Sequence, residues 1–188
     1  MRRPRGPLIG ALALLVAVVG ILVLHERPAQ AVDRPFQLVD AKTGQQVTDQ
    51  TFRGKWVLIF FGYSFCPDVC PTTLSDIAET MSELGPLSAK VQPLFVTVDP
   101  ARDTSKVLAD YTSAFDPRIL GLTGTPTQIA AAAKVFNVTY ARRGLGADYS
   151  VDHTATVYVM RPDGAYDSNF LPSSGPALMT EKLRRLID

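Results

Sequence analysis

The feature that most constrains the fold of this chain is a continuous apolar run of strand length, VLIFF at residues 57–61. Such a run predicts a strand that is buried on both faces, because a strand with one solvated face alternates apolar and polar side chains. A second run of this kind, VQPLFVTV at residues 91–98, follows a segment with helical spacing at residues 72–84. Strands that alternate with helices pair in parallel, so the sequence predicts an α/β sheet with helices packed on it.

Shorter patterns complete the predicted domain. The stretch TPTQ at residues 125–128 predicts a helix start, with a threonine cap, a proline at the first helical position and a glutamine three residues after the cap. The stretch RPDG at residues 161–164 predicts the turn of a β-hairpin, which adds antiparallel edges to the sheet. We therefore expect one three-layer α/β domain at residues 34–188. The other predicted elements are strands at 36–39, 45–48, 154–160 and 165–170 and helices at 104–115, 125–136 and 177–187.

An apolar N-terminal segment precedes this domain. Residues 8–24, LIGALALLVAVVGILVL, are 17 apolar residues without interruption, and Arg2, Arg3 and Arg5 lie before them. As a helix the run would extend about 26 Å, near the lower limit for a bilayer core of about 30 Å. Because basic flanks stay in the cytoplasm, we predict a membrane anchor at residues 1–24, a linker at 25–33 and a domain outside the cytoplasm.

The alternative is a cleaved signal peptide, because AQA at residues 29–31 resembles a cleavage site. We favour the retained anchor, because 17 residues exceed the usual apolar length of a signal peptide, about 7–15 residues. Both alternatives place the domain in an extracytoplasmic compartment.

Net charge and cysteine count exclude two classes of protein. A net charge of +1 gives no electrostatic footprint for nucleic acid. Two cysteines, Cys66 and Cys70, are too few for a disulfide-rich scaffold, and a bridge between them would close too small a loop to restrict the unfolded chain much. A chemical role for the pair is the better hypothesis. The alternatives are two buried small hydrophobic side chains or a fortuitous disulfide.

The cysteine pair, in the pattern Cys-x-x-x-Cys, directly follows the first buried strand. Ligand crevices of open α/β sheets lie beyond the carboxyl ends of the strands, so the pair occupies the expected site position. Pro71 suits the first turn of a helix, which puts Cys70 near the cap and Cys66 on the preceding loop. No Lys or Arg occurs from residue 56 to residue 89, whereas four acidic residues do. An acidic surround disfavours free thiolates and favours a bound cation, and thiolates select copper(I) among metals.

His153 is the candidate third ligand, because it is the one histidine in the predicted domain and can accompany a close cysteine pair. The alternative is a capped loop residue. It stands at the mouth of the predicted strand 154–160, and imidazole suits both copper states. Three ligands suffice for copper, whereas a structural zinc site normally has four. The neighbouring Asp152 is a candidate to orient the imidazole, with a cap or a solvated charge as the alternative. His25, in the predicted linker, is expected to be solvated.

Four stretches resemble the Sco/SenC family of copper chaperones for cytochrome c oxidase assembly: GKWVLIFFGYSFCPDVCPTTL, PLFVTVDPARDT, GLTGT and DYSVDHTATVYVMRPDG. The resemblance runs from about residue 52 to residue 187. It implies a thioredoxin-like three-layer α/β/α sandwich with an N-terminal strand pair and a transmembrane helix. It also implies copper, one ion per domain, bound by Cys66, Cys70 and His153. Asp99 matches an acidic position near the metal site of the family, where we expect no direct ligation.

The resemblance also implies partners and a location. These are cytochrome c oxidase subunit II, whose binuclear copper site would accept the metal, and an upstream periplasmic copper donor. The domain would then lie in the periplasm, tethered to the inner membrane by a single span. The main alternative is a thiol–disulfide oxidoreductase that keeps the copper-binding cysteines of the oxidase reduced, with Cys66 and Cys70 as a redox-active disulfide. A thiol peroxidase and a copper-dependent redox sensor are further alternatives.

Overall fold

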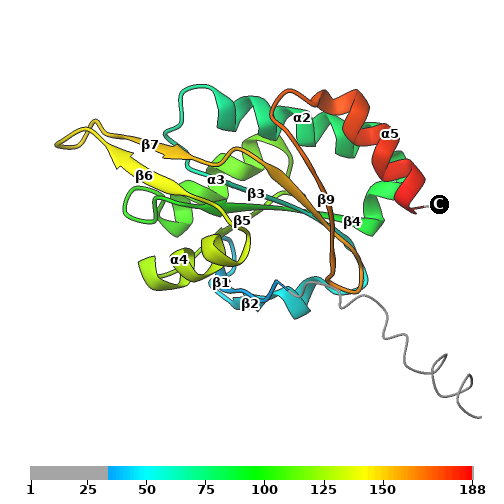
Figure 1. Cartoon of the computed structure of the whole chain (residues 1–188), viewed down its shortest axis with the longest axis horizontal. Helices are drawn as coiled ribbons and strands as arrows, with labels where there is room; N and C mark the ends of the chain where they lie inside the picture. Colours follow the sequence, from blue (N-terminus) through cyan, green and yellow to red (C-terminus); the bar gives the residue numbers. More distant parts are fainter. Residues whose placement is uncertain (1–33, 188) are drawn as a thin grey trace, which may run out of the picture. The chain divides into compact units, whose positions relative to one another are not determined.

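The first buried run forms β3, Trp56–Gly62, an inner strand of a seven-stranded sheet. We describe the fold from a computed structural model, which describes residues 34–187 (Figure 1). Strand β3 pairs in parallel with β4, Val91–Thr97, and antiparallel with β8, Val157–Met160. Every residue of β3 after Trp56 is buried, because both faces of the strand are covered.

The strand order of the main sheet is β2-β1-β5-β4-β3-β8-β9. The mixed α/β sheet that the sequence predicts is confirmed, since β4 also pairs in parallel with β5 while β1, β2, β8 and β9 pair antiparallel. A separate two-stranded sheet is formed by β6 and β7. The remaining strands are β1 Gln37–Asp40, β2 Gln46–Thr48, β5 Leu120–Thr123, β6 Tyr140–Arg143, β7 Ser150–His153 and β9 Tyr166–Phe170.

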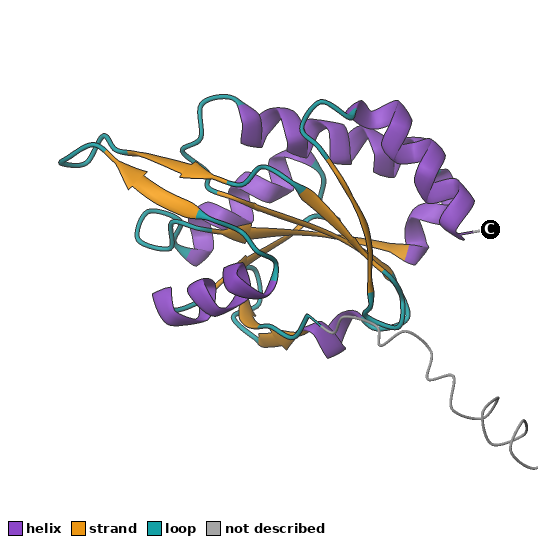
Figure 2. Ribbon diagram, viewed as in Figure 1, coloured by secondary structure: helices purple, strands orange, loops and turns teal. Residues whose placement is uncertain are grey.

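Helices lie on both faces of the main sheet, as Figures 1 and 2 show. Helices α2 and α5 pack together on one face, α3 packs against β5 and α2, and α4 lies on the opposite face. Each face of β3 contributes to an aromatic pair, because successive side chains of a strand point to opposite faces. Phe60 packs on Phe95, and the adjacent Phe61 packs on Phe136. The helices are α2 Val69–Glu83, α3 Ser105–Phe115, α4 Pro126–Val135 and α5 Gly175–Ile187, with short 3-10 helices η1 Asp49–Phe52 and η2 Gly85–Lys90.

The predicted start of α4 is confirmed. The hydroxyl of Thr125 accepts a hydrogen bond from the Gln128 amide, and the Gln128 side chain accepts one from the Thr125 amide at 2.9 Å. Together the two contacts form a capping box, which satisfies amides that the first helical turn leaves without partners.

Three strands escaped the sequence analysis: β5, β6 and β7. Strand β5 has only four residues and contains Gly121, which reads as a strand breaker. The structure explains this glycine, because a Cβ atom there would lie 2.9 Å from Cγ of Leu108 on α3. Strands β6 and β7 carry mostly polar residues and bury only Val151, so they lack the apolar pattern that predicts a strand.

Two predicted boundaries were wrong by three residues. Helix α2 begins at Val69 instead of Thr72, because Pro71 lies at the third helical position, where the missing N–H would have no intrahelical partner in any case. Strand β8 begins at Val157 instead of Thr154. His153 therefore ends β7 and does not open the following strand.

The predicted anchor at residues 8–24, the linker and the cleavage-site alternative at residues 29–31 lie outside the described residues and stay predictions. Within residues 34–187, no helix is both long enough and apolar enough to span a bilayer.

Candidate metal centre

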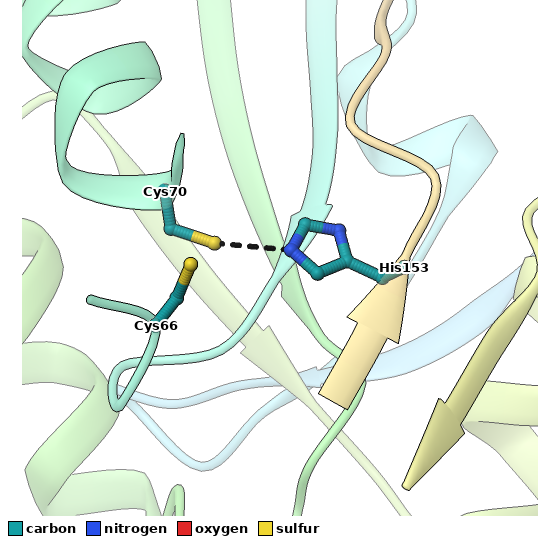
Figure 3. Close-up of side chains that lie close together, drawn as sticks. All are labelled: Cys66, Cys70 and His153. Carbon is teal, nitrogen blue, oxygen red and sulfur yellow. Dashed lines mark hydrogen bonds between the residues drawn. The ribbon is translucent and has the colours of Figure 1, made fainter. Parts of the chain in front are cut away.

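Cys66, Cys70 and His153 meet at one point of the fold (Figure 3). Their sulfur and nitrogen atoms all lie within 4.8 Å of one another, and Sγ of Cys70 is 3.3 Å from Nε2 of His153. Cys66 comes from the loop between β3 and α2, Cys70 from the first turn of α2, and His153 from the end of β7. This is the only such group of potential metal ligands in the part of the chain that the structure describes.

Asp103 holds the loop that carries Cys66. Its fully buried carboxylate accepts hydrogen bonds from the amide of Ser64 at 3.1 Å, from the Ser64 hydroxyl and, at 2.6 Å, from the Thr97 hydroxyl. These contacts tie the start of the loop to the end of β4. Asp103 was not predicted as a site residue, although its place just beyond a buried strand was a usable signal.

Gly62 makes room for the thiol of Cys70. A Cβ atom at this position would lie 2.7 Å from Sγ of Cys70 and 2.7 Å from the ring of Phe95. Cys70 is fully buried, whereas Cys66 is half-buried. A side chain at position 62 would therefore push Cys70 out of line with His153.

The imidazole of His153 presents an unprotonated nitrogen to the cysteines. Its Nδ1 lies 3.2 Å from the carbonyl oxygen of Thr154, which can only accept, so Nδ1 carries the proton. The edges of Phe60 and Tyr63 enclose the ring, with centroid distances of 6.1 and 5.8 Å. Burial lowers the pKa of His153, against the opposing effects of the Thr154 carbonyl and the Asp152 charge. The ring is therefore held neutral, which is the form that binds metals.

Burial also controls the thiol of Cys70. It raises the pKa of this thiol well above the ordinary range, and the nearby Cys66 acts in the same direction, while the Tyr63 main chain opposes both. Without a cation Cys70 is thus a thiol, whose proton must leave when a metal binds.

Each of the two predicted acidic neighbours pairs with an arginine. The carboxylate of Asp152 is exposed and pairs with Nε of Arg143 at 2.6 Å, while Nδ1 of His153 faces Thr154 instead. The carboxylate of Asp99 is buried and is occupied by Arg102 at 2.5 Å and by the hydroxyl of Tyr149 at 2.7 Å. Neither aspartate belongs to the group of atoms around Cys66, Cys70 and His153.

The surroundings of the cysteines are less acidic than the sequence around them indicates, because Arg102 lies nearby. The segment around the cysteines contains no Lys or Arg, but the guanidinium of Arg102 lies 4.8 Å from the ring centroid of Phe65, the residue before Cys66. A window of sequence could not include this cation, because it arrives from the loop after β4.

The donor set suits a soft or borderline cation. Two sulfurs and one imidazole nitrogen converge, with no oxygen ligand among them, which is the chemistry that copper(I) and zinc prefer and that calcium and magnesium avoid. Fold and site together define a class: a thioredoxin-like α/β protein with a candidate soft-metal site at the start of the helix that follows the inner strand.

Comparison with known proteins identifies the family. The chain belongs to the SCO1/SenC family, whose model matches residues 25–188. It is 38% identical over 165 residues to the mitochondrial SCO2 homolog of Mus musculus, a match that covers 86% of this chain and 64% of the relative. It is 35% identical over 198 residues to the protein SenC of Rhodobacter capsulatus, covering 96% of this chain and 89% of SenC. The chain thus spans less than two thirds of the mitochondrial relative.

Solved structures support the fold assignment. The structure of Bradyrhizobium japonicum ScoI with copper bound is 42% identical, with a TM-score of 0.76 that covers 82% of this chain and 99% of ScoI. The structure of yeast Sco1 with copper bound is 36% identical, with a TM-score of 0.74 over 80% of this chain and 85% of Sco1. The thioredoxin-like prediction is therefore confirmed for the described domain.

Proposed function

We propose that this protein binds one copper ion through Sγ of Cys66, Sγ of Cys70 and Nε2 of His153 and delivers it to the binuclear copper site of cytochrome c oxidase subunit II. The observation that carries the proposal is the approach of these three atoms to within 4.8 Å from three separate segments of the chain. The copper-bound structures of related Sco proteins support the choice of metal.

The chain's own groups have separable roles in holding copper. Cys66 and Cys70 supply thiolates, and Cys70 loses its proton on binding. His153 supplies a neutral nitrogen whose direction is set by the Thr154 carbonyl. A three-ligand site leaves room for an incoming ligand, so an acceptor's cysteines and histidines can replace these ligands one at a time.

The proposed location follows from the N-terminal sequence. We infer a single span at residues 8–24 in the inner membrane, with the domain in the periplasm, where an upstream donor supplies copper. Tethering donor and acceptor to one membrane raises their effective concentration without adding contacts. Because the chain covers only part of the mitochondrial relative, this assignment rests on the residues present here.

Copper stoichiometry of purified variants tests the binding. We expect one copper per wild-type chain, loss of stable copper(I) binding in Cys66→Ala and Cys70→Ala, and weakened binding in His153→Ala. The matched control is Asp152→Asn, which alters the residue next to His153 without touching its ring contacts and should bind copper like wild type. Undiminished stoichiometry in Cys66→Ala would refute the assignment.

A second candidate function is thiol–disulfide exchange with the oxidase. Both cysteines are free, and the half-buried Cys66 is the more accessible of the two. Complementation of oxidase activity at low copper separates the candidates. If delivery is the function, His153→Ala fails to restore activity while its dithiol remains intact. Full restoration by His153→Ala would favour the dithiol function instead.

A further inference from the structure

The strand that ends in His153 is not part of the main sheet. Strands β6 and β7 pair only with each other, and their hairpin projects from the domain (Figure 1). An isolated two-stranded hairpin is marginally stable in water. The position of His153 relative to the cysteines therefore depends on the side-chain contacts that hold this hairpin to the rest of the domain.

Arg102 makes two of those contacts from one side chain, beside the hydrogen bond that the Val151 amide donates to the Tyr63 hydroxyl. Its Nη1 donates to the carbonyl oxygen of Tyr149, the residue before β7, at 2.9 Å. Its guanidinium carbon lies 3.6 Å from the ring centroid of Tyr149. These contacts bind the hairpin four residues before His153.

The same guanidinium also contacts the cysteine side of the site. It lies 4.8 Å from the ring centroid of Phe65, next to Cys66, and 5.6 Å from that of Tyr63, whose ring meets His153 edge-on. It is thus shared between the loop that carries Cys66 and the hairpin that carries His153.

Asp99 fixes the guanidinium in place. Its buried carboxylate accepts from Nε of Arg102 at 2.5 Å and from the hydroxyl of Tyr149 at 2.7 Å. The third nitrogen of Arg102, Nη2, is buried and has no hydrogen-bond partner among residues 34–187, so aromatic faces supply the rest of its surroundings. A planar guanidinium can stack and donate in this way, whereas an ammonium cannot.

We propose that Arg102 is a positioning residue for His153: its guanidinium clamps the β6–β7 hairpin to the loop that carries Cys66 and thereby holds the imidazole at the cysteine pair. The copper-binding part of this inference rests on the proposed function. The contacts of Arg102 themselves are present in the metal-free chain. Release of the clamp would withdraw the nitrogen ligand, while Cys70 stays on α2 and Asp103 still holds the loop that carries Cys66.

The test compares Arg102→Lys with Arg142→Ala in the full chain. Lysine keeps the positive charge but lacks the planar guanidinium, which donates from several nitrogens and stacks on aromatic rings. Arg142 is the matched control, because it stacks on the other face of Tyr149 at 3.7 Å and belongs to the hairpin itself. We expect Arg102→Lys to bind copper(II) about tenfold more weakly and to lose the nitrogen signature in its spectrum, as supporting residues around metal ligands typically do on substitution. Arg142→Ala should resemble wild type.

A double-mutant cycle and a metal-free measurement complete the test. The cycle joins Arg102→Lys with His153→Ala. If Arg102 acts through His153, the double variant binds copper no more weakly than His153→Ala alone, whereas additive losses would overturn the proposal. In the metal-free protein, amide exchange at residues 150–154 should accelerate in Arg102→Lys.

A second variant tests the same clamp. If Arg102→Lys does not fold, Tyr149→Leu removes the ring from the clamp and should give the same faster exchange. If the wild-type chain binds no copper, the proposed function fails while the exchange measurement still decides on the clamp. Wild-type exchange in Arg102→Lys, or in Tyr149→Leu where that variant stands in, would overturn it.

Discussion

Gly62 is the residue on which the position of Cys70 depends most directly. We predict that Gly62→Ala lowers the free energy of unfolding by about 1–3 kcal/mol, because the added methyl group would overlap Sγ of Cys70 and the ring of Phe95. It should also expose the Cys70 thiol to alkylating reagents. Urea denaturation and thiol alkylation measure the two effects. Gly121→Ala is the control, because the added methyl group would overlap Leu108, which is not one of the residues around the cysteines. This variant should lower stability without changing thiol reactivity.

Two tyrosines, one buried and one half-buried, should respond differently to loss of their hydroxyl groups. The hydroxyl of Tyr111 is buried and has no hydrogen-bond partner within residues 34–187, although its ring packs on Phe115. Tyr111→Phe should raise stability by about 1 kcal/mol or leave it unchanged.

The hydroxyl of Tyr63 accepts a hydrogen bond from the Val151 amide at 3.2 Å. Tyr63→Phe should cost about 1–3 kcal/mol, because a buried N–H loses its partner. Chemical denaturation of both variants provides the comparison. A more destabilised Tyr111→Phe would contradict this interpretation of the two hydroxyl groups.

At the scale of secondary-structure elements, the Arg118–Asp116 pair joins the segment before β5 to the end of α2. The Arg118 guanidinium donates to the Asp116 carboxylate and, at 3.1 Å, to the carbonyl oxygen of Met81 on α2. Hydrogen bonding from Arg118 lowers the pKa of Asp116, against the effect of burial.

A lowered folded-state pKa makes this pair stabilising above the unfolded pKa of about 4, and the contribution is lost as the pH falls through the folded value. We therefore predict that Asp116→Asn is less stable than wild type at pH 7 by about 1 kcal/mol, a modest figure because Arg118 is partly solvated. The difference should vanish toward pH 2. Urea denaturation across this pH range checks the prediction, and Asp110→Asn, in a solvent-exposed pair, should show no measurable difference at either end.

The N-terminal apolar segment links the domain to its proposed location at the membrane. We predict that the native protein retains residues 8–24 and fractionates with membranes, because this apolar run is longer than a usual signal-peptide core. Intact mass of the protein from its native membrane decides the point. A mature N-terminus at Val32 would show cleavage after Ala31 and remove the tether from the proposed delivery mechanism.

Elements with a local sequence pattern could be predicted without the structure. Long apolar runs predicted β3 and β4, and the capping motif predicted the start of α4. Both patterns depend only on residues that are neighbours in the sequence. Short or polar strands such as β5 and β6 could not be found in this way. Their pairing depends on neighbours that are distant in the chain.

The same division holds for the candidate site. Cys66, Cys70 and His153 were recognisable because soft ligands are rare in this sequence and because their setting resembles a family motif. The surroundings of these three residues became known only from the folded chain. In the structure Asp152 pairs with Arg143 and Asp99 pairs with Arg102. Asp103 holds the loop that carries Cys66, and Gly62 leaves room for the Cys70 thiol. The physical reason is that hydrogen bonds and steric contacts act over a few ångströms in space, whatever the separation along the chain.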